Sequence, residues 1–128
     1  MVDWMLFDTI GDTLYIKILT GRLIELIPDS IEETDEFCQE LYPVIDKIQQ
    51  MCIDQNLKQV GTTDLKDVVV ANIKPLPLIR LIWNIYNHTK SNILLTKFNA
   101  SGADPFVKII VEAVKAFLPP FMINIITV

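Results

Sequence analysis

The chain has 128 residues, of which 51% are hydrophobic and 21% are charged, and its formal net charge is −5. That length fits one domain with a sizeable core, and that composition excludes a disordered chain. The negative charge, the scattered basic residues and the lack of a Gly-rich loop disfavour nucleic acid as a partner. We therefore predict a single domain over residues 1–128.

The sequence shows no targeting signal and no membrane span. No run reaches the roughly 20 apolar residues that a spanning helix needs, and the opening MVDWMLFDTIGD lacks the basic region and cleavage site of a secretory signal. Cys38 and Cys52 would lie about 21 Å apart on a continuous helix, too far for a disulfide, and are predicted to be free thiols. These features predict a cytoplasmic protein.

Apolar and polar residues alternate on either side of a Gly11-Asp12 turn, which predicts a β-hairpin from residues 4–8 and 13–19. Residues 20–28 are expected to continue as extended chain up to Pro28.

A long amphipathic helix is predicted to follow, with Ser30 and Glu33 as its capping box. Apolar residues then recur at the three- and four-residue spacing of a one-faced helix as far as Cys52. Pro43 interrupts this pattern and is expected to kink the helix or split it in two, because proline removes a backbone donor.

The first turns of this helix are crowded with carboxylates: Asp29, Glu32, Glu33, Asp35 and Glu36. Residues 1–56 carry 3 basic and 12 acidic residues, whereas residues 57–128 carry 8 basic and 4 acidic ones. One interpretation is a solvated helix start beside a favourable helix dipole. The other is an electrostatic docking patch for a basic partner or a second copy of the chain.

The second half alternates between predicted strands and helices. Residues 57–60 and 67–73 are expected to be extended on either side of a turn over Gly61–Asp64. The run Val68–Val70 is expected to be a central strand buried on both faces. The elements expected after it are a helix over 76–89, a strand over 92–98, a helix from Asp104-Pro105 to Pro119-Pro120, and a last strand over 121–128. This order predicts an α/β domain with a mostly parallel sheet, an N-terminal hairpin and three packed helices.

The second and third predicted helices have apolar faces that are wider than a helix on a sheet needs. Their apolar arcs span about 220° and about 200° at 100° per residue, whereas packing on a sheet needs a stripe of about 100° or a little more. One interpretation is that the two helices pack on each other with the excess apolar surface. The other is that this surface meets a partner, another copy or an acyl chain. The candidate interaction residues are Leu76, Ile79, Trp83, Tyr86, Phe106, Val107, Val111 and Leu118.

No catalytic or metal site is expected. The single histidine, His88, is predicted to lie in solvent at a helix end, and no serine has a G-x-S-x-G context. One histidine and two distant cysteines do not make a zinc site, and the acidic run lacks calcium-loop spacing. No cofactor is predicted.

Two stretches resemble known families. IGDTLYIKILTGRLIELIP followed by a helix resembles the opening of a STAS domain, the fold of bacterial anti-sigma-factor antagonists. ILLTKFNASGADPFVKIIVEAVKAFLPPFMINIITV resembles the end of a CRAL-TRIO lipid-binding domain. Both families imply the α/β architecture predicted above. The region that would match the STAS switch serine, residues 68–80, has no serine or threonine, so such a phosphorylation switch is not expected.

The CRAL-TRIO resemblance implies lipid binding, but the chain is short for the helical parts that usually complete a lipid cavity in that family. We therefore expect a non-catalytic module for protein–protein interaction or self-association. Binding of a lipid or another hydrophobic ligand is the alternative, and an enzyme with an unrecognised site is third.

Overall fold

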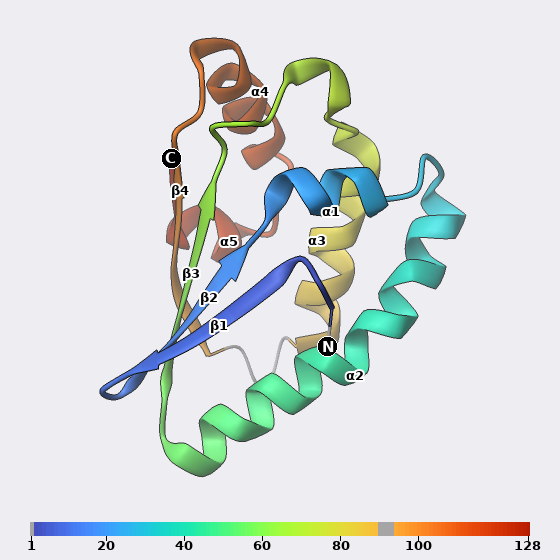
Figure 1. The fold of residues 1–128 in the computed structure, drawn as a ribbon. Helices are drawn as coiled ribbons and strands as arrows, with labels where there is room; N and C mark the ends of the chain where they lie inside the picture. The colour runs from blue at the N-terminus through green and yellow to red at the C-terminus, as the bar shows by residue number, and fades with distance from the viewer. Residues whose placement is uncertain (1, 90–93) are drawn as a thin grey trace.

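The computed structural model describes residues 2–89 and 94–128 (Figure 1). In chain order the elements are β1 (Met5–Ile10), β2 (Thr13–Ile18), α1 (Thr20–Leu26), α2 (Ile31–Gln55), β3 (Lys58–Asp64), a 3₁₀ turn η1 (Val70–Asn72), α3 (Pro75–Thr89), β4 (Leu95–Ser101), α4 (Pro105–Lys115), α5 (Pro120–Ile125) and β5 (Ile126–Thr127).

The strands form one sheet in the order β1-β2-β3-β4-β5. β1 is antiparallel to β2, and every later pair is parallel. Gly11 closes the β1–β2 hairpin with a φ of +61°, a left-handed conformation that favours glycine. The predicted α/β class, with a mostly parallel sheet behind an N-terminal hairpin, is confirmed.

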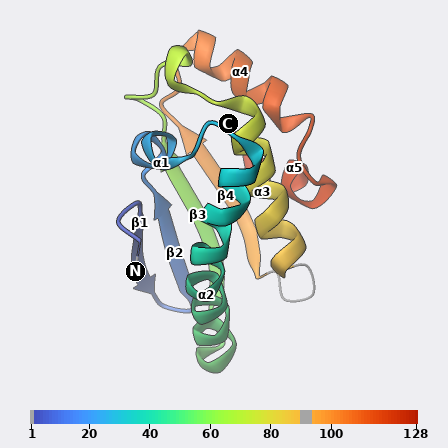
Figure 2. The ribbon, with the colours of Figure 1, turned by 90° about the vertical axis from the view of Figure 1, so that its right-hand side faces the viewer.

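The helices described by the structure cover one face of the sheet. Figure 2 shows α2 and α3 lying side by side in front of the strands. Burial alternates accordingly: Leu14 of β2 is 1% exposed, whereas its neighbour Tyr15 is 38% exposed and Ile10 of β1 is 61% exposed. The expectation of a central strand buried on both faces is therefore wrong.

The helix α2 runs through Pro43 without interruption, so the predicted split does not occur. Ser30 is the N-cap, and its Oγ accepts the Glu33 N–H at 3.1 Å. Leu41 and Ile45 lie on either side of Pro43 and are both buried in the core, which holds the two halves of the helix on the same surface.

Residues 20–26 form the helix α1 rather than extended chain. Leu23 and Ile27 are four residues apart and both enter the core, a spacing that suits a helix. A short apolar run of this kind fits either a strand or a helix by its pattern alone.

The second parallel strand lies earlier than expected. β3 covers Lys58–Asp64 and so contains the Gly61–Asp64 stretch that was expected to be a turn. In the predicted strand Val68–Val70 only Val68 is buried, whereas Val69 is 49% and Val70 39% exposed. The next predicted strand, 92–98, lies partly outside the described residues, and β4 begins at Leu95.

The double proline separates two helices. α4 ends at Lys115, and Pro120 occupies the first turn of the short α5, a position that proline favours. The predicted final strand is thus reduced to the two residues of β5, which pair with Phe98 and Asn99 of β4.

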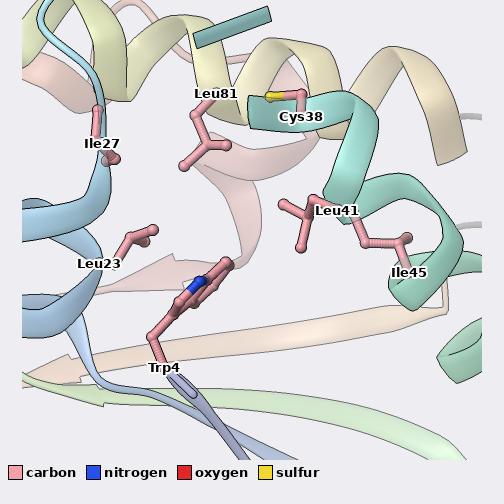
Figure 3. Close-up of a cluster of buried hydrophobic side chains, with 7 residues drawn as sticks. All are labelled: Trp4, Leu23, Ile27, Cys38, Leu41, Ile45 and Leu81. Carbon is pink, nitrogen blue, oxygen red and sulfur yellow. The ribbon is translucent and has the colours of Figure 1, made fainter. Parts of the chain in front are cut away.

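The largest buried cluster joins α1, α2 and α3 above the start of β1. Figure 3 shows the Trp4 ring pointing from the sheet toward side chains of all three helices. The cluster consists of Trp4, Leu23, Ile27, Cys38, Leu41, Ile45 and Leu81. It fixes α2 and α3 at one end of the sheet and leaves the β3–β4 part of the inner face to α4 and α5.

Candidate functional site

A cavity of about 330 Å³ lies between the inner face of the sheet and the helices. Its lining is almost entirely apolar. Ile16 and Phe98 line it from the sheet, Leu81 and Ile85 line it from α3, and Val111 lines it from α4. The shortness of the chain argues against a lipid cavity of the usual CRAL-TRIO kind, yet the structure contains this apolar space.

The floor of the cavity depends on a glycine. Gly61 of β3 is paired with Phe98 of β4, and a Cβ added at Gly61 would collide with the Cδ2 and Cε2 atoms of Phe98. The edge of the aromatic ring therefore lies against Gly61 on the inner face. A glycine inside a strand often marks such a close approach.

The buried polar groups beside the cavity are paired with each other. Gln59 donates to Gln49, and the Thr20 and Thr63 hydroxyls are hydrogen-bonded together. The Thr63 hydroxyl also donates to the Ile18 carbonyl at 2.7 Å. Within residues 2–89 and 94–128, no buried side-chain nitrogen or oxygen lacks a partner. The fully buried polar side chains of the cavity wall are therefore all hydrogen-bonded over this stretch.

Lys115 is the one charged side chain among the described residues that line the cavity. It is half-buried in the last turn of α4, and its Nζ donates to the Ile126 carbonyl at 3.0 Å. The ammonium therefore lies where α4 meets the C-terminal strand.

A polar seam joins α2 and α3 on the side away from the sheet. Arg80 donates to both carboxylate oxygens of Asp35, at 2.8 and 3.0 Å, and the Asn84 amide donates to Asp35 at 2.7 Å. The hydrogen bond from Arg80, followed by that from Asn84, lowers the pKa of Asp35 to about 2. Further along the seam His88 lies 2.7 Å from Asp46.

The predicted acidic patch is divided by these contacts. Asp35 belongs to the seam, and Asp29 lies 3.1 Å from Lys74. Glu32, Glu33 and Glu36 are exposed and form no ion pair with any residue that the structure describes. These three carboxylates are the members of the patch that the described residues leave without an ion-pair partner.

The eight candidate interaction residues separate into three groups. Leu76 and Phe106 are exposed, at 70% and 73%, and Ile109 and Phe117, which were not among the eight, are similarly exposed. Val107 and Leu118 are buried and line the cavity. The half-buried residues are Ile79, Trp83, Tyr86 and Val111.

Trp83 joins α3 to the chain that follows α4. Its Nε1 donates to the Phe117 carbonyl at 2.7 Å, and its ring meets Tyr86 edge-on at 6.0 Å. Tyr86 in turn approaches Phe121 of α5. These contacts join α3 to the chain after α4 and to α5.

The described residues bring together no metal-binding group of His, Cys, Asp or Glu side chains. The His88 ring stacks on Tyr42 with 4.1 Å between ring centroids, and the same ring forms a pair with Asp46. Within the described residues, no serine or cysteine side chain forms a hydrogen bond with this pair. Burial raises the pKa of the Cys38 thiol, which disfavours a reactive thiolate. None of the described helices has the length and apolar character to cross a bilayer.

No protein-family model and no curated protein matches the sequence. The solved structure of Sfh5, a Sec14/CRAL-TRIO family protein, is similar to this chain with a TM-score of 0.55 at 15% sequence identity. The fold is CRAL-TRIO-like. The match covers 96% of this chain and 45% of Sfh5, so the chain spans about half the length of that protein. The STAS resemblance of the N-terminal half stays a prediction.

Proposed function

We propose that this CRAL-TRIO-like domain binds one small hydrophobic molecule in the cavity between its sheet and its helices, and that it does so without catalysis. The observation that carries the proposal is the apolar lining of the cavity, which draws on β2, β3, β4, α3, α4 and α5. An empty apolar cavity forfeits dispersion contacts, and burying an apolar ligand there recovers them.

The size of the cavity suggests the size of the ligand. Its 330 Å³ is near the lower end of small-molecule pockets, which span about 300–1,000 Å³. One water molecule occupies about 30 Å³ of liquid, and a methylene group is of similar size, so the cavity suits a chain of about eleven heavy atoms. A single acyl chain or a compact hydrophobic molecule fits this volume.

The resemblance of residues 93–128 to the end of CRAL-TRIO lipid-binding domains agrees with this proposal. That stretch supplies β4, α4, α5 and β5, which wall one side of the cavity. The similarity of fold is consistent with a lipid-like ligand, but it does not identify which ligand is bound.

Isothermal titration calorimetry with 1-decanol tests the proposal. We expect one site per chain and a negative heat-capacity change, the signature of apolar burial. Val111→Phe, which places a larger side chain in the cavity, should weaken binding at least about tenfold. Ile109→Phe is the matched control, because Ile109 lies on the same helix and is 65% exposed. Equal affinity for both variants would remove the cavity as the binding site.

A second candidate function is association with a protein partner or a second copy through exposed apolar side chains. Leu76 begins α3, and Phe106, Ile109 and Phe117 lie on or just after α4, all with at least 65% of their surface exposed. Sedimentation of the parent beside Phe106→Ser tests it. A parent that dimerises and a folded variant that does not would favour this function, whereas a monomeric parent would speak against self-association.

A further inference from the structure

Resting on the proposed function, we propose that the ligand is a single-chain anionic amphiphile whose head group binds Lys115 while its chain fills the cavity. The charge of the cavity wall is unevenly distributed. Among the described lining residues, Lys115 is the one charged side chain, and no carboxylate, arginine or histidine accompanies it.

The Lys115 ammonium has unused hydrogen-bonding capacity. It has three donors, and the described part of the chain supplies one acceptor, the Ile126 carbonyl at 3.0 Å, with no carboxylate within ion-pair distance. Lysine can pack its methylene stem on an apolar surface while its ammonium stays at the margin, where an anion can reach it. A carboxylate or a phosphate monoester at the end of an acyl chain would supply the missing charge.

The other lysine of α4 gives a matched comparison. Lys108 lies seven residues earlier, on the same side of the helix, but it is exposed and does not line the cavity. The two lysines thus lie on the same side of the same helix, and they differ in that Lys115 lines the cavity and Lys108 does not.

Lys115 also has a structural role that the experiment must separate from ligand binding. It lies in the last turn of α4, where the helix dipole favours a cation, and it holds the Ile126 carbonyl. A neutral ligand of the same chain length separates the two roles. If Lys115 acts only by holding the cavity wall together, its replacement should weaken the binding of charged and neutral ligands equally.

The test compares decanoate, decyl phosphate and 1-decanol by calorimetry at neutral pH on the parent, Lys115→Met and Lys108→Met. We expect the parent to bind at least one of the two anions about tenfold more tightly than decanol, the scale of one charge-assisted hydrogen bond. Lys115→Met should lose this preference and keep its affinity for decanol, whereas Lys108→Met should behave as the parent does. A preference for one anion over the other identifies the head group.

Two results overturn the inference. If the parent binds decanol as tightly as both anions, or if Lys115→Met keeps the preference, the head group does not bind Lys115 even though the cavity takes a chain. If neither decanol nor the anions bind the parent, the proposed function itself fails.

Discussion

Phe98 packs so closely against Gly61 that a single methyl group on the glycine would collide with the edge of the aromatic ring. The two residues are paired across β3 and β4 on the inner face. The sheet side of the cavity therefore depends on Gly61 having no side chain and on the Phe98 ring that packs in its place.

Gly61→Ala should destabilise the domain by about 1–3 kcal/mol, the usual range for overpacking, because the Phe98 ring must move into the cavity. Urea unfolding measures the loss. Thr62→Val is the control, since Thr62 pairs with Asn99 on the opposite face of the sheet and an isosteric change there should stay within about 0.5 kcal/mol. A Gly61→Ala variant as stable as the parent would show that the ring does not lie over the glycine.

The core cluster predicts unequal effects for two leucines of α3. Leu81 is 2% exposed and packs with Trp4 and Leu41, whereas Leu76 on the same helix is 70% exposed. Leu81→Ala should cost about 2–5 kcal/mol through lost burial and a residual cavity, and Leu76→Ala should cost less than about 0.5 kcal/mol. Similar losses for both variants in denaturant melts would contradict the position of α3.

The α2–α3 seam predicts a dependence of stability on acid. Hydrogen bonds from Arg80 and Asn84 hold the pKa of Asp35 at about 2, below the usual 3.8. Because the folded state holds this proton less tightly than the unfolded state, the stabilisation is complete above about pH 4 and is lost as the pH falls toward about 2.

The melting temperatures of the parent and of Asp35→Asn measure this effect. The parent should melt higher at pH 6, and the difference should shrink between pH 4 and pH 2. Glu36→Gln is the control, because Glu36 is exposed and forms no ion pair with the described residues. A difference between parent and Asp35→Asn that stays constant down to pH 2 would mean that the seam does not depend on the Asp35 charge.

Trp83 is predicted to stabilise the domain from within rather than to anchor a partner. Trp83→Phe removes the hydrogen bond to the Phe117 carbonyl and should cost about 0.5–1.5 kcal/mol in urea unfolding. Trp83→Lys should be more destabilising, because it places a charge in a half-buried aromatic contact. A folded Trp83→Lys variant that only loses association would instead assign this side chain to an interface.

The sequence predicts the fold class well because the strongest local signals agree with the tertiary structure. The Gly11 turn, the Ser30 cap and the Asp104-Pro105 helix start each serve the role that their chemistry favours, and Asp104 Oδ1 accepts the N–H groups of Phe106 and Val107. These devices act over a few residues, so local reasoning finds them.

The errors arise where tertiary context decides. The apolar pattern of residues 20–26 fits a strand as well as a helix. These residues form α1 in the structure, where Leu23 and Ile27 both enter the core. The polar Gly61–Asp64 stretch becomes a strand because it is paired on both sides by β2 and β4. The cavity was not predicted because its sheet side depends on the Gly61–Phe98 contact across 37 positions, and Gly61 was interpreted as a turn residue rather than as a glycine inside a strand.

Native mass spectrometry of the purified chain, followed by solvent extraction of what it carries, tests the binding account most directly. The account predicts monomers with one bound molecule each, and an extract that contains a single-chain amphiphile. After delipidation, excess 1-decanol or decanoate should restore one adduct per chain. A chain that carries nothing, forms dimers, and takes up neither compound would contradict the account and leave protein association as its function.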